Sequence, residues 1–132
     1  CFACGKANPI GLRMEFFQDG EFYKSVWTPT ENFQGYPGIL HGGITCSLLD
    51  EIMGRFLYME GLVAPTVELN VRYKTAVPIG QPVTLSSWVI ERKKRLVIMG
   101  GRLTLEDGTV AAEADAKFII AKGQGAFAEP QG

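Results

Sequence analysis

The chain of 132 residues is long enough for one domain and too short for two. Its hydrophobic content of 46% fits a folded core, and its net charge of −1 lacks the basic excess typical of nucleic-acid-binding proteins. We therefore expect no nucleic-acid partner. We also expect no membrane span, because no apolar run is long enough to cross a membrane.

The three cysteines, Cys1, Cys4 and Cys46, are odd in number and unevenly spaced, unlike a disulfide framework. We therefore expect reduced thiols in a cytoplasmic protein. Cys1 and Cys4 have the spacing of half a zinc knuckle, but no second pair follows and His41 is the only histidine. Because structural zinc sites normally take four ligands, we expect no metal site and interpret this segment as an N-terminal turn.

The N-terminal third of the chain predicts two strands between irregular segments. Residues 1–11 are rich in turn formers and predict an irregular lead-in. Residues 12–29 have the composition of strands, and Asp19-Gly20 marks a hairpin turn within them. Residues 30–43 contain one proline and four glycines and predict a loop.

A long helix is predicted from Ile44, where apolar residues begin to recur at intervals of three and four. Gly61 is a suitable stop signal, so the helix should have about 16 residues, longer than the usual 11 or 12. Asp50 falls at the edge of the apolar stripe, where an uncompensated carboxylate is unusual. The stripe consists of Ile44, Leu48, Leu49, Ile52, Met53, Phe56 and Leu57.

The remainder predicts four strands joined by short turns, followed by a flexible tail over residues 122–132. On the last strand Ala112, Ala114 and Ala116 share one face, which indicates that another element packs closely there. The four segments with strand patterns are residues 66–74, 83–91, 96–106 and 109–120.

One amphipathic helix cannot cover both faces of such a sheet. The simplest arrangement is an α+β fold over residues 1–121, with an antiparallel sheet wrapped around one long central helix. The outer face and the edges of the sheet would then need cover, which a symmetric partner could supply.

The segment His41-Gly42-Gly43 stands at the expected helix start. Free backbone N–H groups and the helix dipole can stabilise an oxyanion there, and glycine permits close approach of a ligand. Alternatively, the glycines only allow a tight entry and His41 caps the helix. Asp50 also has two interpretations, as a general base or nucleophile, or as an ion-pair partner of Arg72 or Lys74 at a subunit contact.

These residues resemble the hotdog-fold acyl-CoA thioesterases of the PaaI-like branch. His41-Gly42-Gly43 is followed, nine positions after the histidine, by Asp50 on the same helix. The segments FQGYPGILHGG and VELNVRYKTAVPIG are closer to the thioesterase-superfamily-member group, which has a threonine sixteen positions after the aspartate, here Thr66. The segment CFACGKANPIGL resembles the N-terminal segment of bacterial relatives, and the similarity covers residues 1 to about 121.

The resemblance implies hydrolysis of an acyl-CoA thioester to a carboxylic acid and coenzyme A. No cofactor is implied, because coenzyme A is part of the substrate. Asp50 would activate water or attack the carbonyl, and Thr66 would orient the water or the aspartate. The Gly42 N–H would bind the thioester oxygen, with His41 fixing the loop. Gly43 would also contact the substrate.

The resemblance also implies a homodimer, or a dimer of such dimers. In it the His41 loop of one subunit would face Asp50 of the other. Two other functions keep the same fold: a hotdog acyl-thioester dehydratase and a non-catalytic acyl-CoA-binding module.

The sequence departs from the family pattern at two places. Many PaaI-like members carry an asparagine six positions before the histidine, where this chain has Gly35; Gln34 or Asn32 could supply the polar group instead. Thr66 falls in the alternation phase of the polar strand residues. To face the site, the strand start must twist, or its polar face must line the dimer cleft.

Two further groups are candidates for binding the substrate. The basic run Arg92, Lys93, Lys94 and Arg95 could bind the phosphates of coenzyme A, or it could be a solvated hairpin. Phe33 and Tyr36, in the loop before the helix, could contact the acyl group or the pantetheine arm, or serve as packing anchors.

Overall fold

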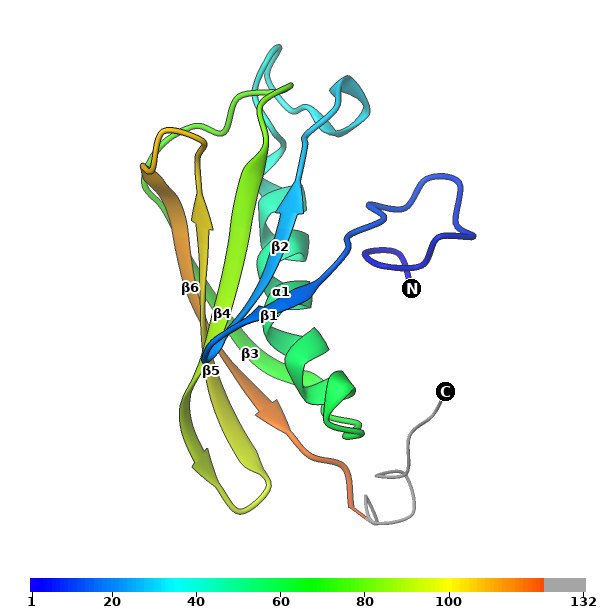
Figure 1. Cartoon of the computed structure of the whole chain (residues 1–132), viewed down its shortest axis with the longest axis vertical. Coiled ribbons are helices and arrows are strands. Elements are labelled where there is room, and N and C mark those ends of the chain that lie inside the picture. The colour runs from blue at the N-terminus through cyan, green and yellow to red at the C-terminus, as the bar shows by residue number, and fades with distance from the viewer. Residues whose placement is uncertain (123–132) are drawn as a thin grey trace.

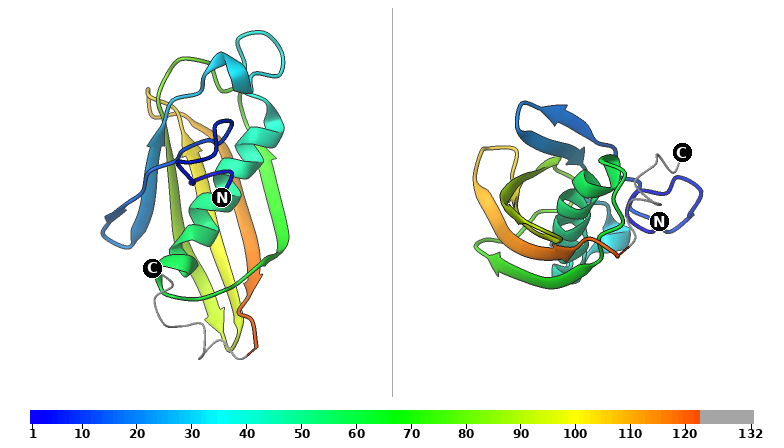
Figure 2. Two further views of the ribbon diagram at one scale, coloured as in Figure 1. Left: turned by 90° about the vertical axis from the view of Figure 1, so that its right-hand side faces the viewer. Right: turned by 90° about the horizontal axis from the view of Figure 1, so that it is seen from below.

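The computed structural model describes residues 1–122, so all of the predicted tail except Lys122 lies outside the described residues. Within this range, a six-stranded antiparallel sheet curls around one long helix (Figure 1; Figure 2). This confirms the predicted α+β arrangement. In chain order the elements are β1 Phe17–Asp19, β2 Phe22–Trp27, a short 3-10 helix η1 Glu31–Phe33, α1 Gly42–Met59, β3 Thr66–Tyr73, β4 Val83–Lys93, β5 Leu96–Thr104 and β6 Val110–Ile119. Along the sheet the strands follow the order β1-β2-β4-β5-β6-β3.

The predicted N-terminal hairpin is present, but its first strand is short. The turn residues are Gly20 and Glu21, one position later than the predicted Asp19-Gly20, because Asp19 pairs with Phe22; Gly20 lies in the left-handed region at φ 63°. Residues 12–16, which the composition assigned to a strand, instead pair their backbone with the lead-in, for example Leu12 N–H with the Phe2 carbonyl at 2.8 Å. The β1–β2 hairpin therefore begins only at Phe17.

Helix α1 has 18 residues rather than the predicted 16, because it begins two residues earlier, at Gly42. It ends at Met59, and the predicted stop signal Gly61 follows the C-cap Glu60 with a φ of +83°, which lets the Leu62 N–H reach the Leu57 carbonyl at 3.1 Å. Such a left-handed turn suits glycine because glycine has no Cβ. The apolar stripe of α1 supplies the centre of the core.

Small residues let α1 lie close to the sheet. A Cβ on Gly101 of β5 would lie 3.2 Å from Met53 Cγ, and one on Gly54 of α1 would lie 3.3 Å from the Phe118 ring. The predicted small face of β6 is buried, with Ala112, Ala114 and Ala116 at most 4% exposed. The close packing inferred from these residues is therefore confirmed.

Strands β1 and β3 form the two edges of the sheet. β3 has eight residues and pairs with β6 on one side only within residues 1–122. Long free edges expose backbone groups that can pair with another chain. Among the described helices, none is long and apolar enough to cross a membrane.

Candidate active site

Asp50 and Thr66 meet where the middle of α1 faces the start of β3. The Thr66 Oγ1 donates a hydrogen bond of 2.7 Å to Asp50 Oδ1. Asp50 is half-buried at the edge of the apolar stripe, as its helical position predicts. The two residues are sixteen positions apart in the sequence. They come together because the chain turns back beside α1 after the helix ends.

A β-bulge turns Thr66 toward the helix. Thr66 stands opposite Phe118, whereas Glu68 stands opposite Lys117, so one extra residue has been inserted in β3. Val67, at the bulge, is 59% exposed. Of the two arrangements that the sequence left open, the irregular strand start is the one found.

The basic residues proposed as ion-pair partners of Asp50 are engaged elsewhere in the chain. Arg72 lies 3.1 Å from Asp115 Oδ1, and Lys74 pairs with Glu113. The hydrogen bond from Asn70, and then the contact with Arg72, lower the pKa of Asp115, and the contact with Lys74 lowers the pKa of Glu113. Among residues 1–122, Asp50 is therefore left with Thr66 as its polar partner.

His41 is the N-cap of α1. Its Nδ1 accepts a hydrogen bond from the Gly43 N–H at 2.8 Å, and its carbonyl accepts from Ile44 N–H at 3.0 Å. The Gly43 N–H is therefore engaged within the loop. The Gly42 N–H has no hydrogen-bond partner among residues 1–122, and Gly42 is exposed. The first turn of α1 thus offers one free, accessible donor.

Tyr73, at the end of β3, holds the same turn. Its hydroxyl donates to the Gly42 carbonyl at 2.7 Å and lies 2.9 Å from Cys46 Sγ. Burial raises the pKa of Tyr73 to about 12, helped by the hydrogen bond and charge of Cys46. Sequence reasoning missed Tyr73. The one signal that could have found it is that its hydroxyl stands in the set of alternating strand positions otherwise occupied by apolar residues.

The loop before α1 is tied to the helix start. Gln34 Oε1 accepts a hydrogen bond from Gly38 N–H at 3.0 Å, and the Phe33 carbonyl accepts from His41 N–H at 2.9 Å. A Cβ on Gly35 would lie 3.3 Å from His41 Cα, so a side chain at this position would crowd the histidine. Gln34 thus helps to fix the shape of the loop, and it stands next to Gly35, the position at which many PaaI-like members carry an asparagine.

The aromatic candidates of this loop differ in their surroundings. Phe33 packs on Trp27 with ring centroids 5.7 Å apart, as a packing anchor would. Tyr36 is 82% exposed, and Asn32 is exposed as well. A hollow of about 370 Å³ lies between Tyr36, His41 and Gly42, and a second, of about 280 Å³, includes Gly42 and Tyr73. Gly42 therefore borders two open spaces.

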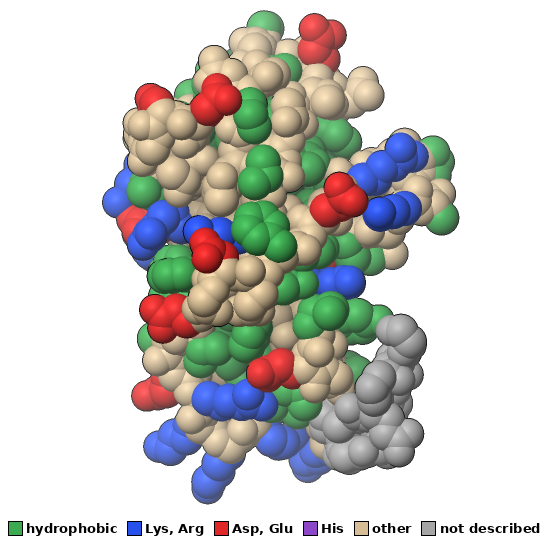
Figure 3. Space-filling model, in the orientation of Figure 1, with side chains coloured by type: hydrophobic (Ala, Val, Ile, Leu, Met, Phe, Trp, Pro, Cys, Tyr) green, Lys and Arg blue, Asp and Glu red, His purple; other side chains and the backbone are tan. Residues whose placement is uncertain are grey.

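The basic run lies at the end of the molecule away from the start of α1, on the β4–β5 hairpin (Figure 1; Figure 3). Arg92 pairs with Glu60 at 3.0 Å, and Arg95 donates to the Ile120 carbonyl at 3.3 Å. Lys93 and Lys94 are exposed, with Lys94 in the left-handed turn position at φ 55°. Within one chain, this run does not meet the His41 loop.

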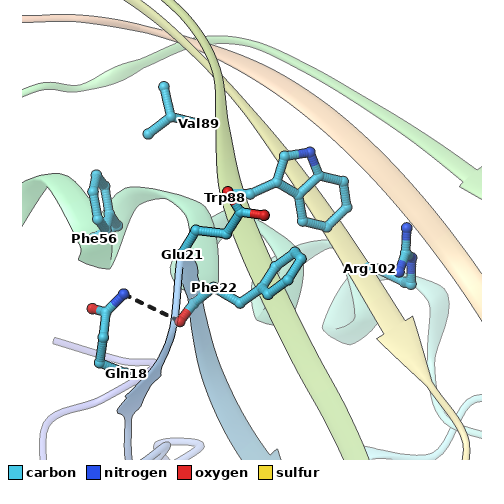
Figure 4. Close-up of a pocket in the computed structure, with 7 residues that line it drawn as sticks. All are labelled: Gln18, Glu21, Phe22, Phe56, Trp88, Val89 and Arg102. Atoms are coloured by element: carbon cyan, nitrogen blue, oxygen red, sulfur yellow. Dashed lines mark hydrogen bonds between the residues drawn. The ribbon is translucent and has the colours of Figure 1, made fainter.

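Another hollow, of about 560 Å³, lies beside the β1–β2 hairpin (Figure 4). Trp88 lies across Gly100, where a Cβ would fall 2.5 Å from the indole, and the Arg102 guanidinium stacks 4.9 Å from the Trp88 ring. None of the candidate catalytic residues lines this hollow, whose walls are Gln18, Glu21, Phe22, Phe56, Trp88, Val89 and Arg102.

The two halves of the candidate site are separated within one chain. Gly42 and Asp50 are eight residues apart on α1, which corresponds to a rise of about 12 Å along the helix axis. A carbonyl group cannot contact both the Gly42 N–H and the Asp50 carboxylate over such a distance. One chain therefore presents two partial sites.

Solved structures show the same fold. The chain matches the thioesterase superfamily protein RHA08564 with a TM-score of 0.83 and 25% identity, over 89% of this chain and 61% of that one. It matches a hypothetical thioesterase from Streptococcus pneumoniae, crystallised with coenzyme A, with a TM-score of 0.76 and 18% identity, over 82% and 85% of the two chains. These likenesses identify the fold as the hotdog fold of thioesterases.

Sequence comparison points to the same family. Mouse acyl-coenzyme A thioesterase THEM4 is 32% identical over 111 residues, which cover 78% of this chain and 48% of THEM4. The chain thus spans about half the length of the curated relatives it matches. The family model described as "Thioesterase superfamily" matches residues 37–112, which include the His41 loop, Asp50 and Thr66. Because that match covers more than half of the 132 residues, the chain belongs to the thioesterase superfamily.

Proposed function

We propose that this protein is an acyl-CoA thioesterase that hydrolyses its substrate to a carboxylic acid and coenzyme A. The observation that carries the proposal is the hydrogen bond of 2.7 Å between Thr66 and Asp50. Family membership and the name of the mouse relative support the reaction class, and the coenzyme A of the pneumococcal protein supports the ligand. Coenzyme A belongs to the substrate, and the reaction needs no cofactor.

Asp50 is the proposed base or nucleophile. As a base, its carboxylate takes a proton from water while the water oxygen bonds to the thioester carbon. The C–S bond then breaks, and the proton passes to the departing coenzyme A sulfur. As a nucleophile, Asp50 itself bonds to that carbon, the C–S bond breaks, and coenzyme A leaves as a thiolate that takes a proton from solvent; water then hydrolyses the acyl-aspartyl anhydride and restores the carboxylate. In both cases Thr66 occupies Oδ1 and leaves Oδ2 for the reaction.

The Gly42 N–H is the proposed donor to the developing oxyanion. It is exposed and free of partners within residues 1–122, at the positive end of the α1 dipole. His41 and Tyr73 fix the turn on either side of it through Gly43 N–H and the Gly42 carbonyl. Both therefore act as positioning residues.

A second copy of the chain completes the proposed site. About 12 Å of helix separates Gly42 from Asp50 in one subunit, so the oxyanion donor must come from the partner. The free edge of β3, with Val67 and Tyr73 59% and 54% exposed, is a suitable surface for symmetric pairing. We propose a homodimer on this edge, with dimers of such dimers as a further level of assembly, in the cytoplasm.

The substrate contacts follow from the same arrangement. Tyr36 borders a hollow beside Gly42, where it can contact the acyl group or the pantetheine arm, and Gly43, Gln34 and Asn32 shape that loop. Lys93 and Lys94 are exposed and have no ion-pair partner among residues 1–122, so they are the cations of the basic run best placed for the coenzyme A phosphates. Arg92 and Arg95, already engaged with Glu60 and Ile120, border them.

A dehydratase is less well supported than a hydrolase. Such an enzyme would use a histidine and an acid facing one cleft, but the His41 Nδ1 is engaged as the helix cap. A non-catalytic acyl-CoA-binding module would not need the Asp50–Thr66 pair. The hydrolase therefore accounts for more of the geometry.

A thiol-release assay across acyl-CoA chain lengths tests the proposal, with wild type compared to Asp50→Ala. Loss of the base should lower kcat by roughly 10²-fold or more. Asp19→Ala is the matched control, since Asp19 lies on the β1–β2 hairpin and pairs with Lys24 at 2.7 Å. If coenzyme A is released from none of the acyl-CoA substrates, the proposed thioesterase activity is wrong. Binding of acyl-CoA measured by calorimetry would then favour the non-catalytic binding module. Equal activity of Asp50→Ala would remove Asp50 from the mechanism.

A further inference from the structure

The N-terminal turn brings two thiols and a carboxylate together on the side of α1. The Sγ atoms of Cys1 and Cys4 and a carboxylate oxygen of Glu51 all lie within 4.8 Å of one another. Cys1 Sγ is 3.8 Å from both Glu51 oxygens. The lead-in lies against α1 in both turned views (Figure 2), and this placement creates a three-residue cluster that the linear sequence does not contain.

The turn itself holds the two cysteines on one side. The Gly5 N–H donates to the Cys1 carbonyl at 2.7 Å, which closes the loop around Phe2 and Ala3. A Cβ on Gly5 would lie 2.6 Å from that carbonyl oxygen, so this turn requires glycine. Ala3 is 6% exposed and its carbonyl accepts from Met14 N–H at 2.9 Å, which anchors the turn to the core.

The spacing of these atoms suits a tetrahedral metal ion. With Zn–S near 2.3 Å and Zn–O near 2.0 Å, tetrahedral ligands place sulfur and oxygen about 3.5 Å apart. The Cys1 Sγ to Glu51 distances of 3.8 Å differ from this by a few tenths of an ångström. Thiolates and a carboxylate are ligands that zinc accepts, and paired thiolates select against hard cations.

Arg55 supplies a balancing positive charge. Its NH1 lies 3.5 Å from Cys4 Sγ, and its guanidinium stacks 5.1 Å from the Phe16 ring and 4.8 Å from the Tyr58 ring. Burial, and then the hydrogen bond and charge of Glu51, raise the pKa of Cys4, and the charge of Arg55 offsets this rise in part. Two thiolates and one carboxylate would carry three negative charges, which a divalent ion and Arg55 together neutralise.

We propose that Cys1, Cys4 and Glu51 bind a thiophilic divalent cation of the zinc type. The fourth position faces a hollow of about 300 Å³ that Cys1, Glu51, Gly54, Arg55 and Tyr58 line, where water can complete the coordination. The ion clamps the lead-in to α1. It does not take part in hydrolysis, because Glu51 points about 100° around the helix from Asp50.

This site departs from the expectation drawn from the sequence. The sequence predicts no metal site there, because structural zinc sites take four ligands, no second cysteine pair follows Cys1 and Cys4, and His41 is the only histidine. The third ligand is a glutamate 47 positions after Cys4 on the long helix, and only the packing of the lead-in on α1 brings it there.

Cobalt(II) titration of the reduced full chain, with absorption spectroscopy, tests the site. Thiolate coordination should give a sulfur-to-cobalt charge-transfer band that saturates at one equivalent and is displaced by zinc. Cys4→Ser should abolish the band, and Glu51→Gln should weaken cobalt binding by at least about tenfold. The matched control is Cys46→Ser, which removes the one cysteine outside the cluster and should leave the band unchanged.

Thermal unfolding gives a second readout that does not depend on cobalt spectra. Zinc should raise the Tm of wild type and of Cys46→Ser relative to chelator, because binding to the native state stabilises it. For Glu51→Gln, whose thiols remain intact, the rise in Tm at the same zinc concentration should be smaller. A wild type without the charge-transfer band, or an undiminished band in Cys4→Ser, would overturn the proposal. Equal loss of the band in Cys46→Ser would assign the metal to other thiols.

Discussion

Thr66 reaches Asp50 because β3 contains a bulge at the next residue. The hydrogen bond of 2.7 Å joins the first residue of the strand to the middle of α1. Regular alternation would place Thr66 on the same face as Glu68 and Asn70, away from the helix. The register shift between Thr66 and Glu68 removes this conflict. One inserted residue therefore decides whether the aspartate has its partner.

Thr66→Val should lower kcat while leaving the fold intact. Valine keeps the branched shape but cannot donate to Asp50, and a hydrogen bond to a charged group is worth about 1.5–3 kcal/mol. If that bond orients the carboxylate in the transition state, the loss corresponds to roughly 10- to 100-fold in kcat/KM. Thiol release measured beside thermal unfolding separates the catalytic effect from a loss of stability.

Thr104→Val is the matched control for this substitution. Thr104 is a half-buried strand threonine on β5, opposite Val110 on the β5–β6 ladder. Its replacement should leave kcat/KM within about twofold, as is usual for sites away from special contacts. Equal activities of Thr66→Val and Thr104→Val would show that the Asp50–Thr66 contact has no catalytic role.

Gly42→Pro should remove the proposed oxyanion donor without damaging the helix. Gly42 is the first residue of α1, a position that favours proline, and His41 has the extended backbone (φ −60°, ψ 133°) required before proline. Proline has no N–H, so the loss in kcat should be roughly 10²- to 10³-fold, as for other oxyanion donors.

Gly42→Ala supplies the comparison, because alanine keeps the N–H. Its Cβ would lie 3.6 Å from the Tyr73 hydroxyl, an ordinary contact. We expect near wild-type kcat for alanine and unchanged Tm for both variants. If proline and alanine behave alike, the oxyanion is stabilised by another group.

Mixed dimers of two inactive variants should recover activity. Asp50→Ala retains the glycine turn and Gly42→Pro retains the aspartate, so a mixed dimer contains one shared site in which both groups are intact. Co-expression with two different affinity tags and tandem purification isolates this species for the thiol-release assay. The purified mixture should have up to about half the wild-type kcat per dimer, because one of its two sites is complete.

A site made within one chain predicts the opposite result. Each subunit of the mixed dimer would then lack one group, and activity would stay at the level of the two parents. Sedimentation of wild type is the accompanying control. A monomer at assay concentration would contradict the shared-site proposal directly.

The sequence predicted the fold because its main signals are local. Helical spacing of the apolar stripe identified α1, and alternation identified the strands that wrap around it. The predicted helix start is two residues late, because the low helix propensity of Gly42 and Gly43 argues against a helix at these positions. In the structure His41 caps the helix through Gly43 N–H at 2.8 Å, which lets both glycines join the first turn.

The contacts of the site depended on tertiary structure that local signals do not encode. The bulge beside Thr66 arises from pairing with β6, more than forty residues later. Tyr73 meets Gly42 only because the end of β3 passes the start of α1. Spacing and resemblance could identify Asp50 and Thr66 as candidate site residues, but the hydrogen bond between them could be found only in the structure.

Ionisation of Tyr73 should loosen the helix start at high pH. Burial, and then the hydrogen bond and charge of Cys46, raise the pKa of this phenol from 10 to about 12, so the folded state favours the protonated form. Its contribution to stability is therefore fully present below pH 10 and is lost as pH rises through about 12. The ionised oxygen can no longer donate to the Gly42 carbonyl, to which the protonated hydroxyl donates at 2.7 Å.

Ultraviolet titration of wild type against Tyr73→Phe should resolve one phenol ionising near 12, and the difference in unfolding free energy between the two proteins should shrink between pH 10 and 12. If the phenol that disappears in Tyr73→Phe is one that titrates near the ordinary value of 10, then Tyr73 is not held by Gly42 and Cys46 in solution.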